Sequence, residues 1–389
     1  MSGALKRDEW ETVRLGDVFE LQMGKTPSRD VLEYWNNGDN PWVSISDLST
    51  YSKYVGGTKE TISNLGVDKS GIKKVPPNTV IMSFKLSIGK TAITTDYVYT
   101  NEAIMAFIPK ETRIFDTSYL YYLLSGINWD KGVSKAVKGK TLNKQYLSTY
   151  NIPLPPLDIQ RQIADTLDKV TELITLRKTQ LEKLDELVKA WFVEMFGEPV
   201  LNPKDWECKT VIDECDCMVP GRDKPKSFTG DIPWITIEDL AVNGVTYESK
   251  RGLGLTQEEI DEVNRKTIPK GSVIMSCVGN LGICSIAGKE MIINQQLHSF
   301  QCGERINNVF LMNYLGYRKD FMNKWASNTT VLYMNKSICN SIPVIIPPIE
   351  LQEQFAAFVE QTDKSKSIIQ QSLDTLETLK KSLMQEYFG

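Results

Sequence analysis

The chain contains the same sequence pattern twice, displaced by about 192 residues. The segment PWVSISDL at positions 41–48 returns as PWITIEDL at 233–240, and the tetrapeptide VIMS occurs at both 80–83 and 273–276. The displacement is nearly constant along the chain, which is too regular for chance. A repeat of this length indicates a duplicated domain rather than a solenoid of short stacked repeats. A duplicated unit is most simply arranged around a pseudo-two-fold axis.

Each half ends in a stretch with the apolar periodicity of a long coiled-coil helix. Pro155-Pro156 and Pro347-Pro348 precede the two stretches, and Asp158 and Glu350 follow where the helix dipole favours negative charge. Apolar residues then recur at alternating intervals of four and three positions, as in a heptad seam. The predicted seam positions are Ile163, Leu167, Val170, Ile174, Leu181, Leu184 and Val188 in the first helix, and Phe355, Val359, Ile369, Leu373, Leu376 and Leu383 in the second.

Polar residues interrupt both seams: Arg177 in the first, and Thr362, Lys366 and Lys380 in the second. Such residues either fix register and partner choice at some cost in stability, or extend their polar ends to solvent. Further apolar residues lie beside the seams, and one helix partner would not cover them all. These residues are Leu173, Leu176, Leu187, Ile368 and Leu379. We therefore expect a second partner surface on the helices.

The rest of each half has the composition of a globular domain. Short β-branched and apolar runs are separated by Gly, Pro and Asn and alternate with shorter helical stretches, which predicts a mixed α/β (α+β) fold. The predicted organisation is a globular domain at 1–153, a long helix at 154–197, a second globular domain at 198–345 and a second long helix at 346–389. Antiparallel pairing of the helices, each roughly 60 Å long, would place the globular domains at opposite ends of a rod.

The cysteines and the hydropathy pattern indicate a cytoplasmic protein. All seven cysteines lie in the second half, whereas a structural disulfide framework would need a counterpart in the first, so we expect reduced thiols. A zinc site is disfavoured, because Cys208, Cys215 and Cys217 lack finger-like spacing and the chain has one histidine. The polar N-terminus and the lack of long apolar runs predict no signal peptide and no membrane span.

Sequence signatures of catalysis are missing. Gly-Lys-Thr occurs three times, but a phosphate-binding loop also needs a glycine five positions earlier, where the chain has Phe19, Phe84 and Ser134. The single histidine, His298, is better explained as a structural hydrogen-bonding residue. We therefore expect no catalytic residues, no metal site and no cofactor bound by this chain itself.

At this point the chain resembles the specificity (S) subunits of Type I restriction-modification systems, over essentially its whole length. The segments PLPPLDIQRQIA at 153–164 and IIPPIELQEQFA at 345–356 are similar to the family's opening of each conserved helix. The two PW segments resemble the motif early in each recognition domain, and Trp10–Val18 also fits the family. The second half departs from the pattern, with Val211-Ile212-Asp213-Glu214 where the first half has Leu15-Gly16-Asp17-Val18.

The resemblance implies a non-catalytic DNA-recognition and scaffolding subunit. Each globular domain would be a target recognition domain that reads one half of a bipartite, asymmetric target in double-stranded DNA, and the helix pair would set the spacer. Two methyltransferase (M) subunits and restriction/motor (R) subunits would assemble around it, and S-adenosylmethionine, ATP and Mg are expected on those partner subunits. Half-sites one DNA turn apart are separated by about 34 Å, which agrees with heads held apart by such a rod.

For DNA contact we favour polar and basic loops of the globular domains. Arginine can take guanine O6 and N7 with both arms of its guanidinium, whereas lysine and serine can hold phosphates. An ordinary solvated loop or hairpin explains these segments equally well. The candidates are Lys25, Ser28, Arg29, Lys85, Lys90, Lys138 and Lys140 in the first domain, and Arg222, Lys224, Lys226, Asn280 and Lys336 in the second.

Two other classes of function remain open from the residues alone. A coiled-coil adaptor whose two globular heads bind proteins would fit the net charge of −4, which is unusual for a DNA-binding protein. An enzyme with an unrecognised site is disfavoured by the single histidine and by the incomplete phosphate loops.

Overall fold

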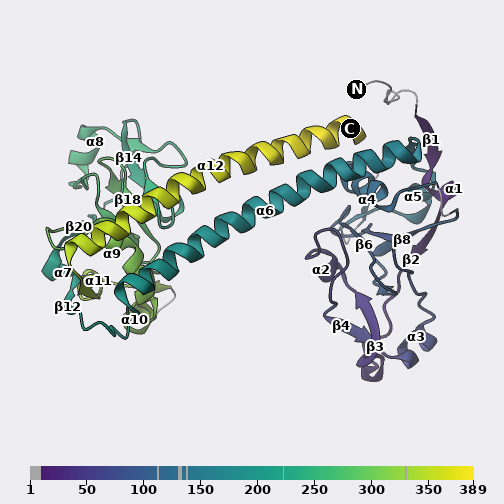
Figure 1. The fold of residues 1–389 in the computed structure, drawn as a ribbon, viewed down its shortest axis with the longest axis horizontal. Coiled ribbons are helices and arrows are strands. Elements are labelled where there is room, and N and C mark those ends of the chain that lie inside the picture. The colour runs from purple at the N-terminus through teal and green to yellow at the C-terminus, as the bar shows by residue number, and fades with distance from the viewer. Residues whose placement is uncertain (1–9, 112–113, 130–133, 137–138, 222, 329–330) are drawn as a thin grey trace. The chain divides into compact units, whose positions relative to one another are not determined.

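The computed structural model describes residues 10–111, 114–129, 134–136, 139–221, 223–328 and 331–389. It divides into two compact units, each built around its own sheets (Figure 1). Unit 1 comprises Met1–Lys178 and Gln371–Gly389, and unit 2 comprises Thr179–Gln370. Each unit therefore contains a globular domain together with segments of both long helices. The domain boundaries that the sequence suggests stay a prediction.

Unit 1 contains a four-stranded antiparallel sheet in the order β2-β8-β5-β6 and a three-stranded sheet in the order β4-β3-β7. A separate two-stranded sheet pairs β1, at the start of the unit, with β11, the strand that precedes the long helix. The strands are β1 Glu11–Arg14, β2 Phe19–Met23, β3 Trp35–Val43, β4 Glu60–Ile62, β5 Val80–Ser83, β6 Thr91–Ile93, β7 Tyr99–Thr100, β8 Ile104–Pro109, β9 Ser134–Ala136, β10 Gly139–Thr141 and β11 Asn151–Leu154. The short helices are α1 Leu15–Val18, η2 Leu32–Tyr34, α2 Ile45–Leu48, α3 Asn64–Ser70, α4 Thr117–Gly126 and α5 Lys144–Thr149.

Unit 2 repeats this topology. Its five-stranded sheet has the order β13-β20-β17-β18-β15, its three-stranded sheet has the order β16-β14-β19, and β12 pairs with β23. The strands are β12 Glu207–Thr210, β13 Cys215–Met218, β14 Ile232–Ile235, β15 Val245–Thr246, β16 Gly254–Leu255, β17 Val273–Ser276, β18 Cys284–Ala287, β19 Ile292–Ile293, β20 Leu297–Cys302, β21 Ser327–Asn328, β22 Leu332–Tyr333 and β23 Pro343–Ile346. The short helices are α7 Val211–Glu214, η4 Ile237–Asp239, α8 Gln257–Glu262, α9 Asn308–Leu315, η5 Gly316–Arg318, α10 Lys319–Trp325 and α11 Lys336–Asn340.

The repeated sequence motifs occupy the same places in both units. The VIMS tetrapeptides are β5 and β17, the central strands of the larger sheets, and all four residues of each are buried. The PW segments form β3 and β14 and lead into a short helix that begins with a capping box. In unit 1 this box joins Ser44 to Asp47, and in unit 2 it joins Thr236 to Asp239. Because each carboxylate accepts bonds from the residue that precedes its helix, the turn after the strand is fixed.

The two long helices are α6, Leu157–Phe196, and α12, Ile349–Phe388. In unit 1, Ile163 and Leu167 of α6 belong to the same buried cluster as Phe388 of α12. In unit 2, Phe192 of α6 lies 5.1 Å from Phe355 of α12, ring centre to ring centre. In both units the start of one helix therefore packs beside the end of the other, as an antiparallel pair requires. The predicted fold class, mixed α/β with an internal repeat and two long helices, is confirmed.

Most predicted seam residues are buried, and the remainder are half-buried. The buried residues are Ile163, Leu167, Val170, Ile174, Val188, Phe355, Val359 and Leu373. The half-buried residues are Leu181, Leu184, Ile369, Leu376 and Leu383. One polar interruption has a partner on the other helix: Lys366 lies 2.6 Å from the Asp185 carboxylate in unit 2. In unit 1, Lys178 and Glu377 form a similar ion pair at 2.9 Å.

A buried glutamine anchors the start of each long helix. The Gln352 side-chain amide donates to the carbonyls of Arg305 and Pro347 at 3.0 and 2.8 Å, and its oxygen accepts the backbone N–H of Asn307 at 2.9 Å. Asn307 is the residue that caps α9, so this side chain joins α12 to α9. In unit 1, Gln160 makes the same three bonds and joins α6 to the cap of α4. The PP-x-x-x-Q motif therefore sets where each helix leaves its globular domain.

Replacement of Gln352 by alanine is expected to destabilise unit 2 by about 2–4 kcal/mol, because buried backbone groups lose their hydrogen-bond partners. Urea unfolding followed by tryptophan fluorescence measures this change. Gln361→Ala is the matched control: Gln361 is an exposed glutamine of the same helix, so the free energy of unfolding should change by less than about 0.5 kcal/mol. Equal midpoints for the two variants would contradict the anchoring role.

The histidine of the chain, His298, lies in β20 with 1% of its surface exposed. Its Nε2 is 3.1 Å from the Asn340 side-chain oxygen, and its ring packs edge-on against Phe300. Burial lowers the pKa of His298 to about 4. In the unfolded chain the same group has a pKa of about 6.5, so protonation favours unfolding.

The free energy of unfolding of unit 2 should therefore fall as the pH decreases from about 6.5 towards 4, with a slope of about 1.4 kcal/mol per pH unit from His298 alone. Above pH 6.5 His298 is neutral in both the folded and the unfolded chain, so it adds no pH dependence to the free energy of unfolding there. His298→Gln removes the titrating group, so between pH 7 and 5 the variant should lose about 2 kcal/mol less than the parent chain. Parallel pH profiles for both proteins, measured by urea unfolding, would show that His298 carries no such linkage.

Candidate nucleic-acid interface

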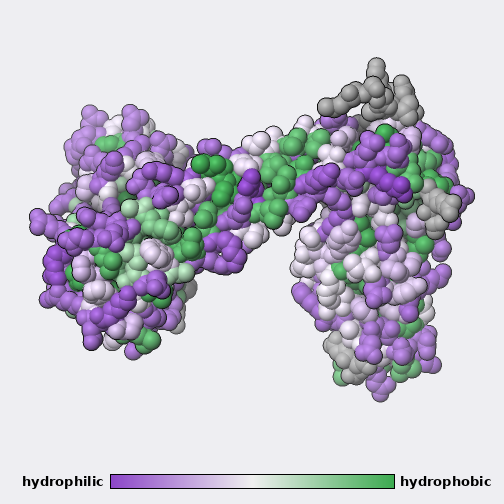
Figure 2. Space-filling view, viewed as in Figure 1, coloured by the Kyte–Doolittle hydropathy of each residue, from purple (hydrophilic) through white to green (hydrophobic). Residues whose placement is uncertain are grey.

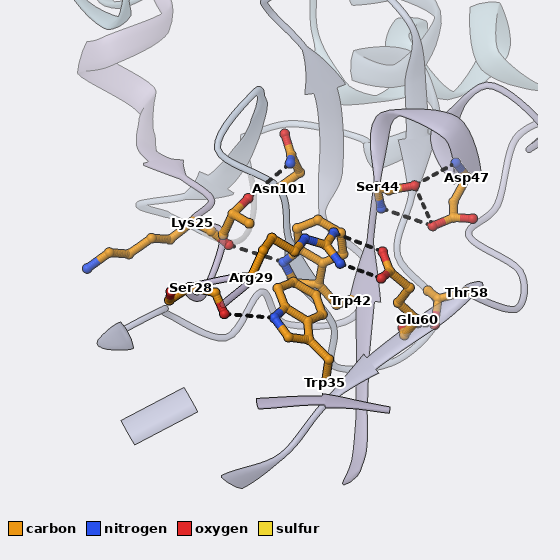
Figure 3. A network of polar contacts seen from close by, with 11 residues as sticks. Lys25, Ser28, Arg29, Trp35, Trp42, Ser44, Asp47, Thr58, Glu60 and Asn101 are labelled. Atoms are coloured by element: carbon orange, nitrogen blue, oxygen red, sulfur yellow. Dashed lines mark hydrogen bonds and ion pairs between the residues drawn. The ribbon is translucent and has the colours of Figure 1, made fainter. Parts of the chain in front are cut away.

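The polar cluster at the three-stranded sheet of unit 1 is built around two tryptophans. Trp35 and Trp42, both in β3, lie at right angles with ring centres 5.0 Å apart. The guanidinium of Arg29 sits 3.6 Å from the ring centre of Trp35 and 5.1 Å from that of Trp42 (Figure 3). Stacking on an aromatic face holds a guanidinium in a fixed plane. Arg29 is thus an exposed arginine with a defined orientation.

Glu60 of β4 binds both arms of this guanidinium, at 2.5 and 3.0 Å. The hydrogen bond to Glu60 raises the pKa of Arg29 above its ordinary value. Half of the Arg29 side chain is exposed, and an ion pair in such a position contributes only about 0–1 kcal/mol. A carboxylate that accepts hydrogen bonds from both NH groups of a guanidinium offers two acceptors side by side, as the O6/N7 edge of guanine does. The cluster is therefore able to exchange Glu60 for a base edge or a phosphate.

The indole N–H groups fix the loop that carries the cationic residues. Trp42 donates to the carbonyl of Lys25 at 3.1 Å, and Trp35 donates to the carbonyl of Ser28 at 3.0 Å (Figure 3). Asn101, after β7, donates to the Thr26 hydroxyl at 3.1 Å. These bonds hold the loop against β3 and against the end of β7. The side chains of Lys25, Ser28 and Arg29 remain exposed, so the predicted residues of this loop lie together on one surface.

A glycine makes the close approach of this loop possible. A Cβ atom on Gly24 would lie 2.1 Å from the Thr100 carbonyl oxygen, so no larger residue fits between β2 and the end of β7. The Gly24 and Lys25 N–H groups donate to the carbonyls of Ile104 and Thr100, at 3.1 and 2.9 Å. The loop therefore begins directly at the sheet.

Unit 2 places a different set of side chains around the equivalent tryptophan. Trp234 of β14 matches Trp42, and the cation above it is Arg265, 4.9 Å from the ring centre. Arg265 follows α8, is 6% exposed and donates to the carbonyls of Asp223 and Ile293. Phe228 packs edge-on against Trp234 at 5.7 Å. The tryptophan position is shared by the two units, but the cation reaches it from another part of the chain.

A cavity of about 390 Å³ opens beside this tryptophan. Its lining combines three cationic side chains with aromatic rings and side-chain amides: Lys224, Arg251, Arg265, Phe228, Trp234, Asn294, Gln295 and Gln296. Arg251 also forms an exposed ion pair with Glu238 at 2.8 Å. Cations, rings and amides together suit a nucleic acid, because they bind phosphates, stack on bases and read base edges.

The remaining predicted residues are not among the contacts that define these two clusters. In the loop after β5, Lys85 is half-buried over Phe84, and the exposed Lys90 donates to the Ser49 hydroxyl at 2.7 Å. Asn280, in the equivalent loop of unit 2, is exposed, as are Lys226 and Lys336, and Lys336 is the first residue of α11. Lys140 lies in β10. Arg222 and Lys138 fall outside the described residues. The predicted DNA contacts stay predictions.

Sequence reasoning missed Arg251, Arg265 and the amides at 294–296. Nothing in their spacing points to Trp234, because the arginines follow β15 and α8 and the amides follow β19. The repeated PW motif was the available signal, since it marks the position around which both clusters form. Among the described residues, no group of three or more His, Cys, Asp or Glu side chains could hold a metal ion, and no helix is long and apolar enough to cross a membrane.

Comparison with known proteins places both repeats in one family. The family model described as the Type I restriction modification DNA specificity domain matches residues 7–186 and 203–378. The MjaIX specificity subunit of Methanocaldococcus jannaschii is 26% identical, with 92% of this chain and 87% of that protein covered. The EcoprrI specificity subunit of Escherichia coli is 30% identical over 42% of this chain and 43% of its own length.

Solved structures share the fold. The S subunit of a Type I restriction-modification system from M. genitalium has a TM-score of 0.58 at 12% identity and covers 98% of this chain and 96% of its own. A chain from a structure that describes complex assembly and conformational transition of the Type I restriction-modification system has a TM-score of 0.62 at 18% identity and covers 97% of both chains.

Proposed function

The chain belongs to the Type I restriction-modification DNA specificity family, and we propose that each of its two units reads one half of a bipartite target in double-stranded DNA. The observation that supports this most directly is the repeated cluster around Trp42 and Trp234. Each cluster combines aromatic rings with exposed cationic side chains, Arg29 in unit 1 and Lys224 and Arg251 in unit 2. Because the cations reach the tryptophan from different segments, the two half-sites differ in sequence.

The chain is a non-catalytic specificity subunit. Methylation and cleavage would be carried out by two methyltransferase subunits and by restriction subunits that assemble with it and bring S-adenosylmethionine, ATP and Mg. The long helices offer a surface for such partners, and apolar areas interrupt the polar surface along them (Figure 2). The exposed apolar residues are Leu173, Leu176 and Leu379 in unit 1, and Leu187, Trp191, Val193 and Ile368 in unit 2. Apolar helix surfaces of this kind bind partner helices.

A coiled-coil adaptor without DNA contact is not favoured, because both repeats match a DNA specificity domain. The net charge of −4 does not count against DNA binding by the globular domains. Part of the acidity is carried by the long helices, for example by Glu360, Asp363 and Glu377 of α12. The methyltransferase complex of a specificity subunit acts on chromosomal DNA, so we expect a cytoplasmic location.

Substitution of an arginine in one of the two tryptophan clusters should relax recognition of one half-site only. Arg29→Ala should reduce the discrimination between bases by about 1–3 kcal/mol at the position that Arg29 reads. Arg251→Ala should cause the same loss in the other half-site. Methylation sites mapped by sequencing in a host that carries the complete system show which positions relax. Arg29→Lys is the matched control, since it keeps the charge and the salt dependence of binding but lacks the two-armed fork. Relaxation of both half-sites by either variant would contradict the proposal.

Lengthening the helix pair should lengthen the spacer between unchanged half-sites. Four residues inserted after Thr175 and four after Thr378, beside the Lys178–Glu377 ion pair, add about 6 Å at slightly more than one turn in each helix. At about 3.4 Å per base pair, the spacer should grow by one or two base pairs. A four-residue insertion between the exposed Gly56 and Gly57 is the control and should leave the target as it was. An unchanged spacer in the helix variant would show that the helices do not set it.

A further inference from the structure

A lysine with little exposed surface closes the space beside α6 in unit 1. The ammonium group of Lys53 lies 2.6 Å from both carboxylate oxygens of Asp168 and 2.8 Å from the Ser118 hydroxyl of α4. The Tyr122 hydroxyl donates to the same carboxylate at 2.6 Å. Only 13% of the Lys53 side chain is exposed. The bend before Tyr54, helix α4 and helix α6 are thus joined through one cation.

The equivalent position in unit 2 is a glycine. The Lys53 carbonyl accepts the N–H of Ile93 at 2.8 Å, and the Gly244 carbonyl accepts the N–H of Ile286 at 2.9 Å. Tyr54 pairs with Ile93, as Val245 pairs with Ile286, in parallel orientation. The two backbones therefore correspond residue by residue at this place.

The partners of the missing lysine are only partly retained. Gln160 and Gln352 make the same bonds, so the eighth residue after each corresponds, and Asp168 matches Glu360. Counted from the caps of α4 and α9, Ser118 matches Val309 and Tyr122 matches Asn313. Unit 2 therefore keeps a carboxylate on the long helix but has neither the lysine nor the hydroxyl groups that close the space in unit 1.

The result is a groove of about 370 Å³ in unit 2, between β15, α9 and α12. Its floor is apolar and includes Val245, Ile286, Met312 and Ala357. Its acidic residues are Glu353, Glu360 and Asp363, all on α12. Strand β15 is the outer strand of the five-stranded sheet, and Val242, Val245 and Tyr247 are 66%, 41% and 58% exposed. An apolar floor with an acidic side is unsuited to the DNA backbone, because phosphates would meet carboxylates.

We propose that this groove binds a segment of a protein partner that presents a lysine or arginine next to apolar side chains. The cation takes the place that Lys53 holds in unit 1 and pairs with Glu360, while the apolar side chains cover the floor. Glu360 now pairs with Lys364 at 2.8 Å, with both side chains at least 70% exposed, so a partner cation replaces a weak contact. Binding occurs at unit 2 alone, because unit 1 supplies its own lysine.

The partner is taken to be a methyltransferase subunit, and in this respect the inference rests on the proposed function. It goes beyond that function in giving the two halves of the chain different protein contacts. A methyltransferase subunit that uses this groove would contact the second repeat in a way that it does not contact the first.

Site-specific photo-cross-linking tests the occupant. A photoreactive phenylalanine analogue replaces Val245 in the full chain, which is then assembled with purified methyltransferase and restriction subunits of the same system. Peptide mapping should find the cross-link on a partner segment that contains lysine or arginine. The same analogue at Tyr54 is the matched control, since Tyr54 is the equivalent, exposed residue of unit 1, and it should give no such product. Cross-links to a restriction subunit, to DNA or to a second copy of the chain, or no cross-link, would overturn the proposal.

Gly244→Lys tests the role of the missing cation. A Cβ on Gly244 would meet no atom closer than 3.7 Å, so the backbone there accepts a side chain, and Gly244 and Glu360 line the same groove. The variant should bind the partner subunit at least about tenfold more weakly, a loss of about 1.4 kcal/mol, with no decrease in its own melting temperature. Gly244→Ala is the control and should bind as the parent does. Unchanged partner affinity of the lysine variant would overturn the proposal.

The DNA target is a separate readout of the same preparations. If the proposed function is wrong, the assembled parent complex recognises no bipartite target, whatever the cross-link shows. If only the groove proposal is wrong, the complex reads its target and Gly244→Lys leaves partner affinity unchanged.

Discussion

The structure depends on burial of the ends of α6 and α12 in the cores of the two units. Phe388, from the helix of the second repeat, belongs to the buried cluster of unit 1. Phe192 and Phe196, from the helix of the first repeat, belong to the buried cluster of unit 2, where they contact Phe310 and Phe355. Fully buried phenylalanines contribute about 3–5 kcal/mol each relative to alanine. Neither repeat therefore completes its core from its own residues, and the duplication is held together by this exchange.

The glutamine anchors give this exchange a fixed geometry. Apolar burial is not directional, but Gln160 and Gln352 each bind three backbone groups at defined positions. Each long helix therefore leaves its globular domain in a set direction, beside the cap of α4 or α9.

The two units differ in side chains at the places for which contacts with other molecules are proposed. The tryptophan of the PW motif is kept, but Arg29 reaches Trp42 from the loop after β2, whereas Arg265 reaches Trp234 from the segment after α8. The backbone beside α6 and α12 is also kept, but Lys53 closes it in unit 1 and Gly244 leaves it open in unit 2. In both cases the sheet and helix framework is constant and the side chains differ, so the halves of the molecule are equivalent in fold and differ at the sites proposed to bind other molecules.

The sequence by itself determined the duplication, the two long helices, the mixed α/β class and the family, because these depend on periodicity and on motifs that are local in the chain. The loop of Lys25, Ser28 and Arg29 was also found from sequence, since basic and turn residues follow one another there. Only the tertiary structure decided that Glu60 holds Arg29, that Arg265 covers Trp234 and that Gly244 corresponds to Lys53. Each of these relations joins residues distant in sequence through side-chain packing or strand pairing, and no local pattern records them.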